Sequence, residues 1–185
     1  MAILDIEFYG SDVLRKVAAP VEEITPEVLK LLDDMVETMR YGRGAGLAAN
    51  QVGVPMRLVV VDLAATSDDP ESLVFCINPE LVEQDGTDIQ EEGCLSIPEV
   101  FEKVKRPRYV KIRALDREGN PFELEGEGFL AKAFCHELDH LDGILFVDRL
   151  SPIRRDIVKR RIKKMIRDGE WENYYERLHA KLASS

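Results

Sequence analysis

The sequence predicts an α+β fold in which mostly antiparallel strands surround a central helix, with further helices near both ends of the chain. Helical periodicity occurs before residue 42 and after residue 128, whereas short apolar and alternating segments fill the stretch between them. Strands and helices are therefore segregated along the chain, which is typical of an α+β fold. The 185 residues contain no repeat and no long linker, so we expect a single domain over residues 1–185.

The first helix is predicted over residues 25–41. Thr25 can cap its amino end, Pro26 suits the first helical position, and Gly42 can end it. Its apolar residues recur at helical spacing and would form one buried face: Val28, Leu31, Leu32, Met35, Val36 and Met39.

Strands are predicted between residues 44 and 127. Residues 57–63 and 73–79 contain short apolar runs that are typical of buried strands. Residues 109–116 alternate between apolar and charged side chains, which predicts a strand with one buried face. Residues 116–120 read Asp-Arg-Glu-Gly-Asn and favour a hairpin turn into a further strand over residues 121–125.

Two helices are predicted in the last third of the chain. The central helix covers residues 129–141. A final helix over about residues 151–182 begins at Ser151 and Pro152, which favour a helix start. Apolar residues recur along it: Ile153, Ile157, Val158, Ile162, Met165 and Ile166.

Charge and composition limit the functions open to the chain. The chain has 25 Lys and Arg against 35 Asp and Glu, a formal net charge of −10, which argues against a nucleic-acid coat protein. Residues 151–185 differ in the sign of their charge, with ten Lys or Arg against five acids, which indicates a basic tail or simply a solvated helix face.

No segment approaches the roughly 20 apolar residues that cross a bilayer. Three cysteines and no secretion signal predict a reduced protein in the cytoplasm.

The most informative motif is His136-Glu137-Leu138-Asp139-His140. On a helix, residues four apart share one face, so both imidazoles can bind one metal ion with Glu137 beside it. We therefore expect the central helix to be a metal-binding helix.

A catalytic metal site normally takes a third protein ligand. The extended metalloprotease pattern would need a histidine where Phe146 stands, and no Glu occurs between residues 141 and 169, so both familiar protease classes are disfavoured. The remaining candidates are His179, an Asp, or Cys94, which lies in a segment bent by Gly and Pro. Cys76 and Cys135 are predicted to pack as small apolar residues.

Three motifs together resemble those of bacterial peptide deformylase, in the family's order and spacing. They are residues 44–51 (Gly-Ala-Gly-Leu-Ala-Ala-Asn-Gln), residues 92–96 (Glu-Gly-Cys-Leu-Ser) and the His-Glu-x-x-His motif. The resemblance runs from about Ile6 into the C-terminal helix. One departure is Cys135, where the family commonly has Gln. The resemblance implies hydrolytic removal of the formyl group from N-terminal formyl-methionine of nascent polypeptides, releasing formate.

The resemblance also implies roles for individual residues. Cys94, His136 and His140 would be the metal ligands, and Glu137 the general acid and base. Gln51 and Leu95 would contact the formyl oxygen. Ferrous iron is implied as the usual native metal, with zinc, nickel or cobalt also able to occupy the site.

The remaining expected site residues would bind the substrate. Gly44, Ala45 and Gly46 leave room for a substrate backbone to approach, because the glycines carry no Cβ. Phe129 and Ala133 share the helix face of His136 and can line a pocket for methionine, although simple core packing is an equal alternative for Phe129. Glu92 and Gly93 complete the set, with Glu92 expected to pair with Arg106 and so hold the Cys94 segment.

These expectations define the partners and the alternatives. We expect N-formyl-Met nascent peptides as substrates, the ribosome as a partner through the basic C-terminal helix, and neither a membrane nor DNA. A His-Glu-x-x-His metallopeptidase is the alternative enzyme, because it shares the metal motif. A zinc-stabilised binding module is the alternative without catalysis.

Overall fold

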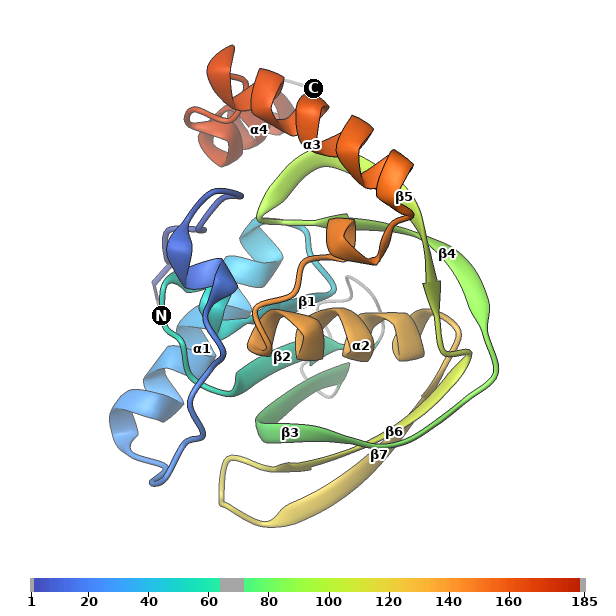
Figure 1. Ribbon diagram of the computed structural model, residues 1–185. Coiled ribbons are helices and arrows are strands. Elements are labelled where there is room, and N and C mark those ends of the chain that lie inside the picture. Colours follow the sequence, from blue (N-terminus) through green and yellow to red (C-terminus); the bar gives the residue numbers. More distant parts are fainter. Residues whose placement is uncertain (1, 64–71, 184–185) are drawn as a thin grey trace.

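Two antiparallel sheets and a helix between them form the centre of the fold (Figure 1). The computed structural model describes residues 2–63 and 72–183. The larger sheet has the order β1-β2-β3-β6-β7 and the smaller one pairs β4 with β5. The strands are β1 (Gly46–Ala48), β2 (Leu58–Asp62), β3 (Leu73–Asp85), β4 (Asp88–Cys94), β5 (Ile97–Arg106), β6 (Tyr109–Leu115) and β7 (Pro121–Glu127). The α+β prediction with mostly antiparallel strands is therefore confirmed.

The helix α1 (Pro26–Tyr41) begins and ends as its sequence predicts. The Thr25 hydroxyl accepts a hydrogen bond from the Val28 amide at 3.4 Å, Pro26 occupies the first turn, and Gly42 is the C-cap. These local signals are sufficient to predict where the helix begins and ends, because capping satisfies amides that have no partner inside the helix.

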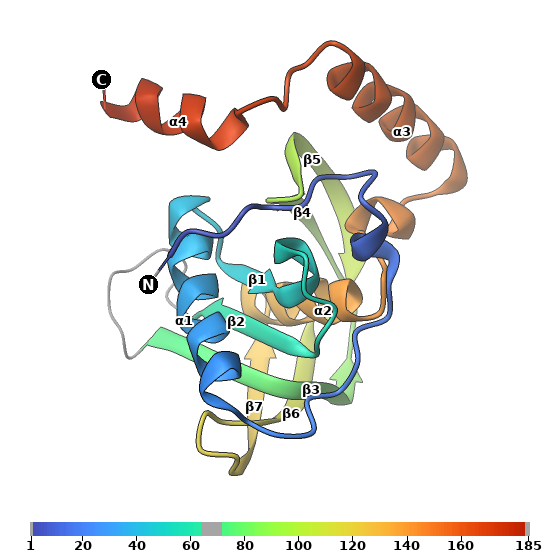
Figure 2. The ribbon, with the colours of Figure 1, turned by 90° about the vertical axis from the view of Figure 1, so that its left-hand side faces the viewer.

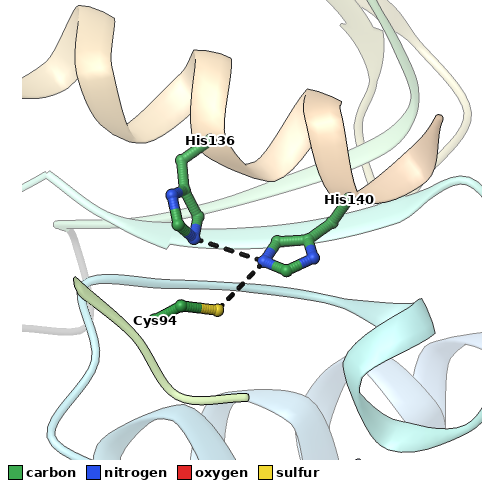
Figure 3. Close-up of side chains that lie close together, drawn as sticks. All are labelled: Cys94, His136 and His140. Carbon is green, nitrogen blue, oxygen red and sulfur yellow. Dashed lines mark hydrogen bonds between the residues drawn. The ribbon is translucent and has the colours of Figure 1, made fainter. Parts of the chain in front are cut away.

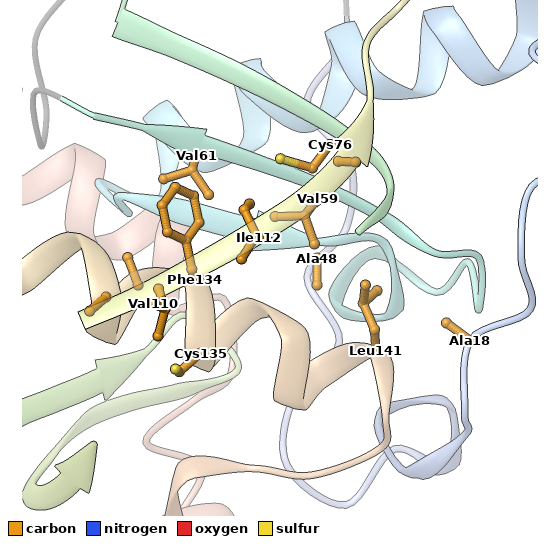
Figure 4. Close-up of a cluster of buried hydrophobic side chains, with 13 residues drawn as sticks. Ala18, Ala48, Val59, Val61, Cys76, Val110, Ile112, Phe134, Cys135 and Leu141 are labelled. Atoms are coloured by element: carbon orange, nitrogen blue, oxygen red, sulfur yellow. The ribbon is translucent and has the colours of Figure 1, made fainter. Parts of the chain in front are cut away.

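Strand β2 is buried along its whole length because helices cover both of its faces. Val59 and Val61 pack with the helix α2 (Phe129–Leu141), whereas Leu58 and Val60 pack with α1. Figure 4 shows the first of these clusters, in which Phe134 of α2 meets the larger sheet. A continuous apolar run is what a strand needs when neither face reaches water.

The smaller sheet has a core of its own. Residues Ile97, Val100 and Val104 of β5 pack with the short helix η4 (Phe146–Arg149) and with the helix α3 (Pro152–Arg167). Because α2 lies between the two sheets (Figure 1), its side chains can meet residues from both.

The C-terminal segment differs from its prediction. Instead of one helix over about residues 151–182, the chain forms α3 and a separate helix α4 (Tyr174–Ala183). The break lies at Gly169 and Asn173, whose φ angles are +69° and +48°, outside the range of a right-handed helix. Between them Trp171 is buried, so the turn brings an aromatic side chain into the second core.

A smaller difference concerns β3, which the sequence predicts over residues 73–79 but which continues to Asp85. Its second half is exposed, and the pairing with β6 shifts register between Ile77 and Glu80, so no apolar pattern marks the extension.

Among the helices of residues 2–63 and 72–183, none combines the length and the apolar character needed to cross a membrane.

Candidate active site

Helix α2 and the end of β4 bring three metal-ligating side chains together (Figure 3). The Sγ of Cys94 lies 3.3 Å from Nε2 of His140, and that nitrogen lies 3.2 Å from Nε2 of His136. In a tetrahedral zinc site, with metal–nitrogen distances of about 2.0–2.1 Å, neighbouring ligand atoms are about 3.3 Å apart. The donor atoms therefore fit one ion. His179 lies elsewhere, where its ring donates to the Tyr41 carbonyl at 2.6 Å, so the geometry favours Cys94 as third ligand.

A buried carboxylate orients His136. Nδ1 of His136 donates to Glu92 at 2.9 Å, so in the neutral ring Nε2, which faces the other candidate ligands, is the nitrogen that can bind a metal ion. Arg106 donates to both oxygens of Glu92, at 2.6 and 2.9 Å. Burial alone would raise the pKa of Glu92, but the hydrogen bonds from Arg106 and His136 lower it to about 2. Glu92 therefore stays charged, and it pairs with Arg106 as the sequence predicts.

The same arginine connects this network to a second carboxylate, on α2. Arg106 Nη1 donates to Asp139 at 2.6 Å, and Asp139 also accepts from Arg149 at 2.5 Å. Sequence reasoning did not single out Asp139 or Arg149. The position of Asp139 inside the metal motif is a usable signal, whereas nothing in the sequence connects Arg149 to it.

Gln51 lies against the candidate metal ligands. Its side-chain nitrogen is 3.5 Å from Cys94 Sγ and donates to the Ser96 hydroxyl at 3.2 Å, and its side-chain oxygen accepts from the Ala48 amide at 3.0 Å. This last bond turns the Gln51 oxygen away from Cys94, so the side-chain nitrogen, which is the donor, faces the site. Leu95 directly follows Cys94 in the turn between β4 and β5.

Gly44 and Gly46 are needed for a reason that the sequence prediction did not include. A Cβ at Gly46 would lie 2.5 Å from Oε1 of Glu137, and one at Gly44 would lie 2.8 Å from the Leu95 side chain. The two glycines let the loop before β1 and the first residue of β1 pack directly on these side chains. The expected role in substrate approach is thus accompanied by a packing role.

Glu137 is enclosed beside the candidate metal ligands. It is 5% exposed, and its Oε2 has no hydrogen-bond partner within residues 2–63 and 72–183. Burial raises its pKa to about 7. A carboxyl group with a pKa near neutrality can both accept and donate a proton at physiological pH.

These residues surround a cavity of about 430 Å³. All of the substrate-binding residues that the sequence predicts lie in its walls: Gly44, Ala45, Gly46, Glu92, Gly93, Phe129 and Ala133. Phe129 is 40% exposed and lies under the Lys132 ammonium, 4.7 Å from the ring centroid, so it is not a core residue. Tyr174, Tyr175 and Leu178 of α4 also line the cavity. Sequence reasoning missed them because it placed them on one long basic helix.

The other two cysteines lie outside this cavity. Cys76 and Cys135 both pack in the core between α2 and the larger sheet. Burial raises the pKa of the Cys76 thiol to about 12 and that of Cys135 to about 11. Both thiols therefore stay protonated and behave as apolar side chains, as predicted.

Comparison with known proteins identifies the family. The polypeptide deformylase family model matches residues 3–156. Peptide deformylase from Acidobacterium capsulatum is 47% identical over 171 residues, covering 92% of this chain and 100% of the relative. The enzyme of that name from Caldanaerobacter subterraneus subsp. tengcongensis is 55% identical over 150 residues, covering 81% and 91%. The crystal structure of a peptide deformylase from Legionella pneumophila matches with a TM-score of 0.84 at 42% identity, covering 92% and 99%. The chain therefore belongs to the polypeptide deformylase family.

Proposed function

We propose that Cys94, His136 and His140 hold one divalent metal ion, and that with it this member of the polypeptide deformylase family hydrolyses the amide bond that carries the formyl group of N-formyl-Met nascent peptides, releasing formate. The observation that carries this proposal is the approach of the three donor atoms to within 4.8 Å of one another, beside the buried Glu137. A divalent ion bound there would polarise the formyl carbonyl and lower the pKa of water.

The side chains around the ion supply the proton transfers and the hydrogen bonds. Glu137 takes a proton from the water that attacks the formyl carbon. As the C–N bond breaks, Glu137 gives this proton to the departing amine, so the products are formate and a free N-terminus. The Gln51 amide and the Leu95 backbone N–H donate to the formyl oxygen as it becomes negative. One such donor is worth roughly 3–4 kcal/mol of barrier.

The remaining walls of the pocket hold the peptide. Phe129 and Ala133 provide the apolar contact that a methionine side chain requires. Gly44, Ala45 and Gly93 line the same cavity, where the peptide backbone would lie. Glu92 acts at a distance by keeping His136 and the end of β4 in place.

The decisive experiment is Glu137→Gln. This change removes the proton carrier but keeps the shape of the side chain and all three ligands. We expect formate release from a formyl-Met peptide to fall at least about 100-fold, with equal metal content. Glu118→Gln, in the exposed turn after β6, is the control and should keep full activity.

Two outcomes would replace the proposal with its alternatives. Cleavage of internal peptide bonds without formate release would indicate a metallopeptidase. If the Glu137→Gln protein functions as well as the wild type, although it has lost the proton carrier that catalysis needs, a zinc-stabilised binding module would be indicated. Both outcomes are read from the same wild-type and variant preparations.

We also propose ferrous iron as the native metal. A thiolate ligand beside Fe(II) is open to oxidation, because oxygen can attack either the sulfur or the iron. Protein purified without oxygen should therefore contain iron and lose activity on aeration, whereas the nickel-loaded enzyme should keep it. Full activity after prolonged aeration of the iron enzyme would exclude this assignment.

We further propose that the enzyme works in the cytoplasm and docks on the ribosome through α3. Arg160, Lys163, Lys164 and Arg167 are exposed on this helix, and such cations can bind RNA phosphates. Replacing all four with Gln should abolish co-sedimentation with ribosomes at low salt. Formate release from free peptides should be unchanged. Co-sedimentation equal to that of the wild type would make α3 a solvated helix only.

A further inference from the structure

Helix α4 lies beyond residues 3–156, which the family model matches, yet it forms part of the pocket wall. Figure 2 shows how the chain bends after α3 so that α4 runs across to the other side of the molecule, above α1. Tyr174, Tyr175 and Leu178 face the same cavity as Glu137. The segment after α3 therefore adds side chains to the active site.

Contacts with three different parts of the fold hold this segment. Trp171 Nε1 donates to the Pro98 carbonyl at 3.2 Å, and the Tyr175 hydroxyl donates to the Leu95 carbonyl at 2.6 Å. The His179 ring stacks on Tyr41 of α1, with ring centroids 3.8 Å apart. The bond of Tyr175 is the one that reaches the catalytic turn.

The turn at Leu95 and Ser96 needs support from outside. Cys94 pairs with Ile97, so only these two residues connect β4 to β5. Two-residue hairpin turns favour positive φ angles, which match the twist of the strands. Neither Leu95 nor Ser96 has a positive φ, so the twist of the strands does not set this turn by itself.

Contacts from three segments provide that support. The Tyr175 hydroxyl holds the Leu95 carbonyl, and the Tyr9 amide holds the Ser96 carbonyl at 2.9 Å. The Leu95 side chain fits against Gly42 and Gly44, where an added Cβ would come within 3.0 and 2.8 Å of it. Leu95 is thus fixed at its side chain by the α1–β1 loop and at its carbonyl by α4.

Tyr175 is suited to hold a carbonyl. Burial raises the pKa of its phenol above the usual range, so the hydroxyl keeps its proton and remains a donor. Its ring stacks on Phe8, with centroids 6.1 Å apart and planes inclined by 16°, which limits rotation of the side chain. The hydroxyl therefore points to one acceptor.

We propose that Tyr175 is a positioning residue for deformylation. By fixing the Leu95 carbonyl it restricts the rotation of the whole residue, so that the Leu95 N–H stays directed at the formyl oxygen. The inference rests on the proposed role of Leu95 in the reaction. Because the hydrogen bond to the formyl oxygen strengthens as charge develops, loss of orientation lowers kcat more than it raises KM.

The test is Tyr175→Phe in the full-length metal-loaded enzyme, with a formyl-Met dipeptide as substrate. The substitution removes the hydroxyl and keeps the ring stack on Phe8. We expect kcat to fall about fivefold, the effect of one neutral hydrogen bond, with KM within about twofold. Metal content should equal that of the wild type.

Trp171→Phe is the matched control. It also removes one bond from this segment to a backbone carbonyl, but at Pro98 in β5 rather than at Leu95. We expect a lower Tm with unchanged kcat. An unchanged kcat in Tyr175→Phe, or an equal fall in Trp171→Phe, would overturn the inference. If the wild-type enzyme releases no formate from this substrate, the proposed function itself fails, so the two failures are distinguishable.

Discussion

At the scale of single residues, Arg106 is the side chain on which the arrangement of the proposed metal site depends most. It is 4% exposed and bonds to Glu92 with two nitrogens and to Asp139 with the third. Through Glu92 it fixes the ring of His136. A buried ion network of this kind is stable only while every charge keeps its partner.

Replacing Arg106 with Met should therefore be strongly destabilising. The change leaves Glu92 and Asp139 buried without this cation, and removing one partner of such a network costs about 3–5 kcal/mol. We expect this loss in urea unfolding, together with weaker metal retention because His136 is no longer oriented. Arg113→Met, which removes a half-exposed ion pair with Glu123, should change stability little. Equal effects of the two substitutions would show that burial of the network does not matter.

At the scale of secondary-structure elements, the break between α3 and α4 can be tested against the alternative of one continuous helix through residue 169. Gly169 has a φ of +69°, where an L-residue is strained. Gly169→Ala should lower stability by about 1 kcal/mol if the break is present, and raise it by a similar amount if one helix ran through residue 169. The sign of the change in the free energy of unfolding decides between them. Circular dichroism would show whether helix content rises.

Elements defined by local signals are the ones that the sequence predicts well. The ends of α1 follow from Thr25, Pro26 and Gly42, because a cap bonds to amides only a few residues away. The burial of β2 follows from its unbroken apolar run. By contrast, the course of the chain after α3 depends on the contact of Trp171 with Pro98, which lies 73 positions earlier, and no periodicity reports such a contact.

In the active site too, local patterns predict some residues, whereas contacts between distant segments determine others. The helical spacing of His136 and His140 predicts their shared face, and the family motifs point to Cys94, Gln51 and Leu95. The contribution of Tyr175 depends on how α4 folds back over the β4–β5 turn, and it could not be predicted while residues 151–182 were assigned to one helix.

At the scale of the whole molecule, the proposed metal ligands lie where separate cores meet. His136 and His140 belong to α2, whose apolar side chains pack on the larger sheet. Cys94 packs against the core of β5, η4 and α3. Leu95, the next residue, packs in the third core, with α1 and β2. An ion bound by all three ligands would thus cross-link α2 to the β4–β5 sheet.

Removing the metal should consequently destabilise the whole protein rather than the site alone. An ion present at 100 times its Kd stabilises the folded state by about 2.7 kcal/mol, so a chelator should lower the Tm of the wild type. Cys94→Ala should lose most of its metal and its response to the chelator. It should keep its fold, since the three cores consist of other side chains. Equal metal content in Cys94→Ala and wild type would show that another residue is the third ligand, because a site with only two imidazoles holds a divalent ion far more weakly.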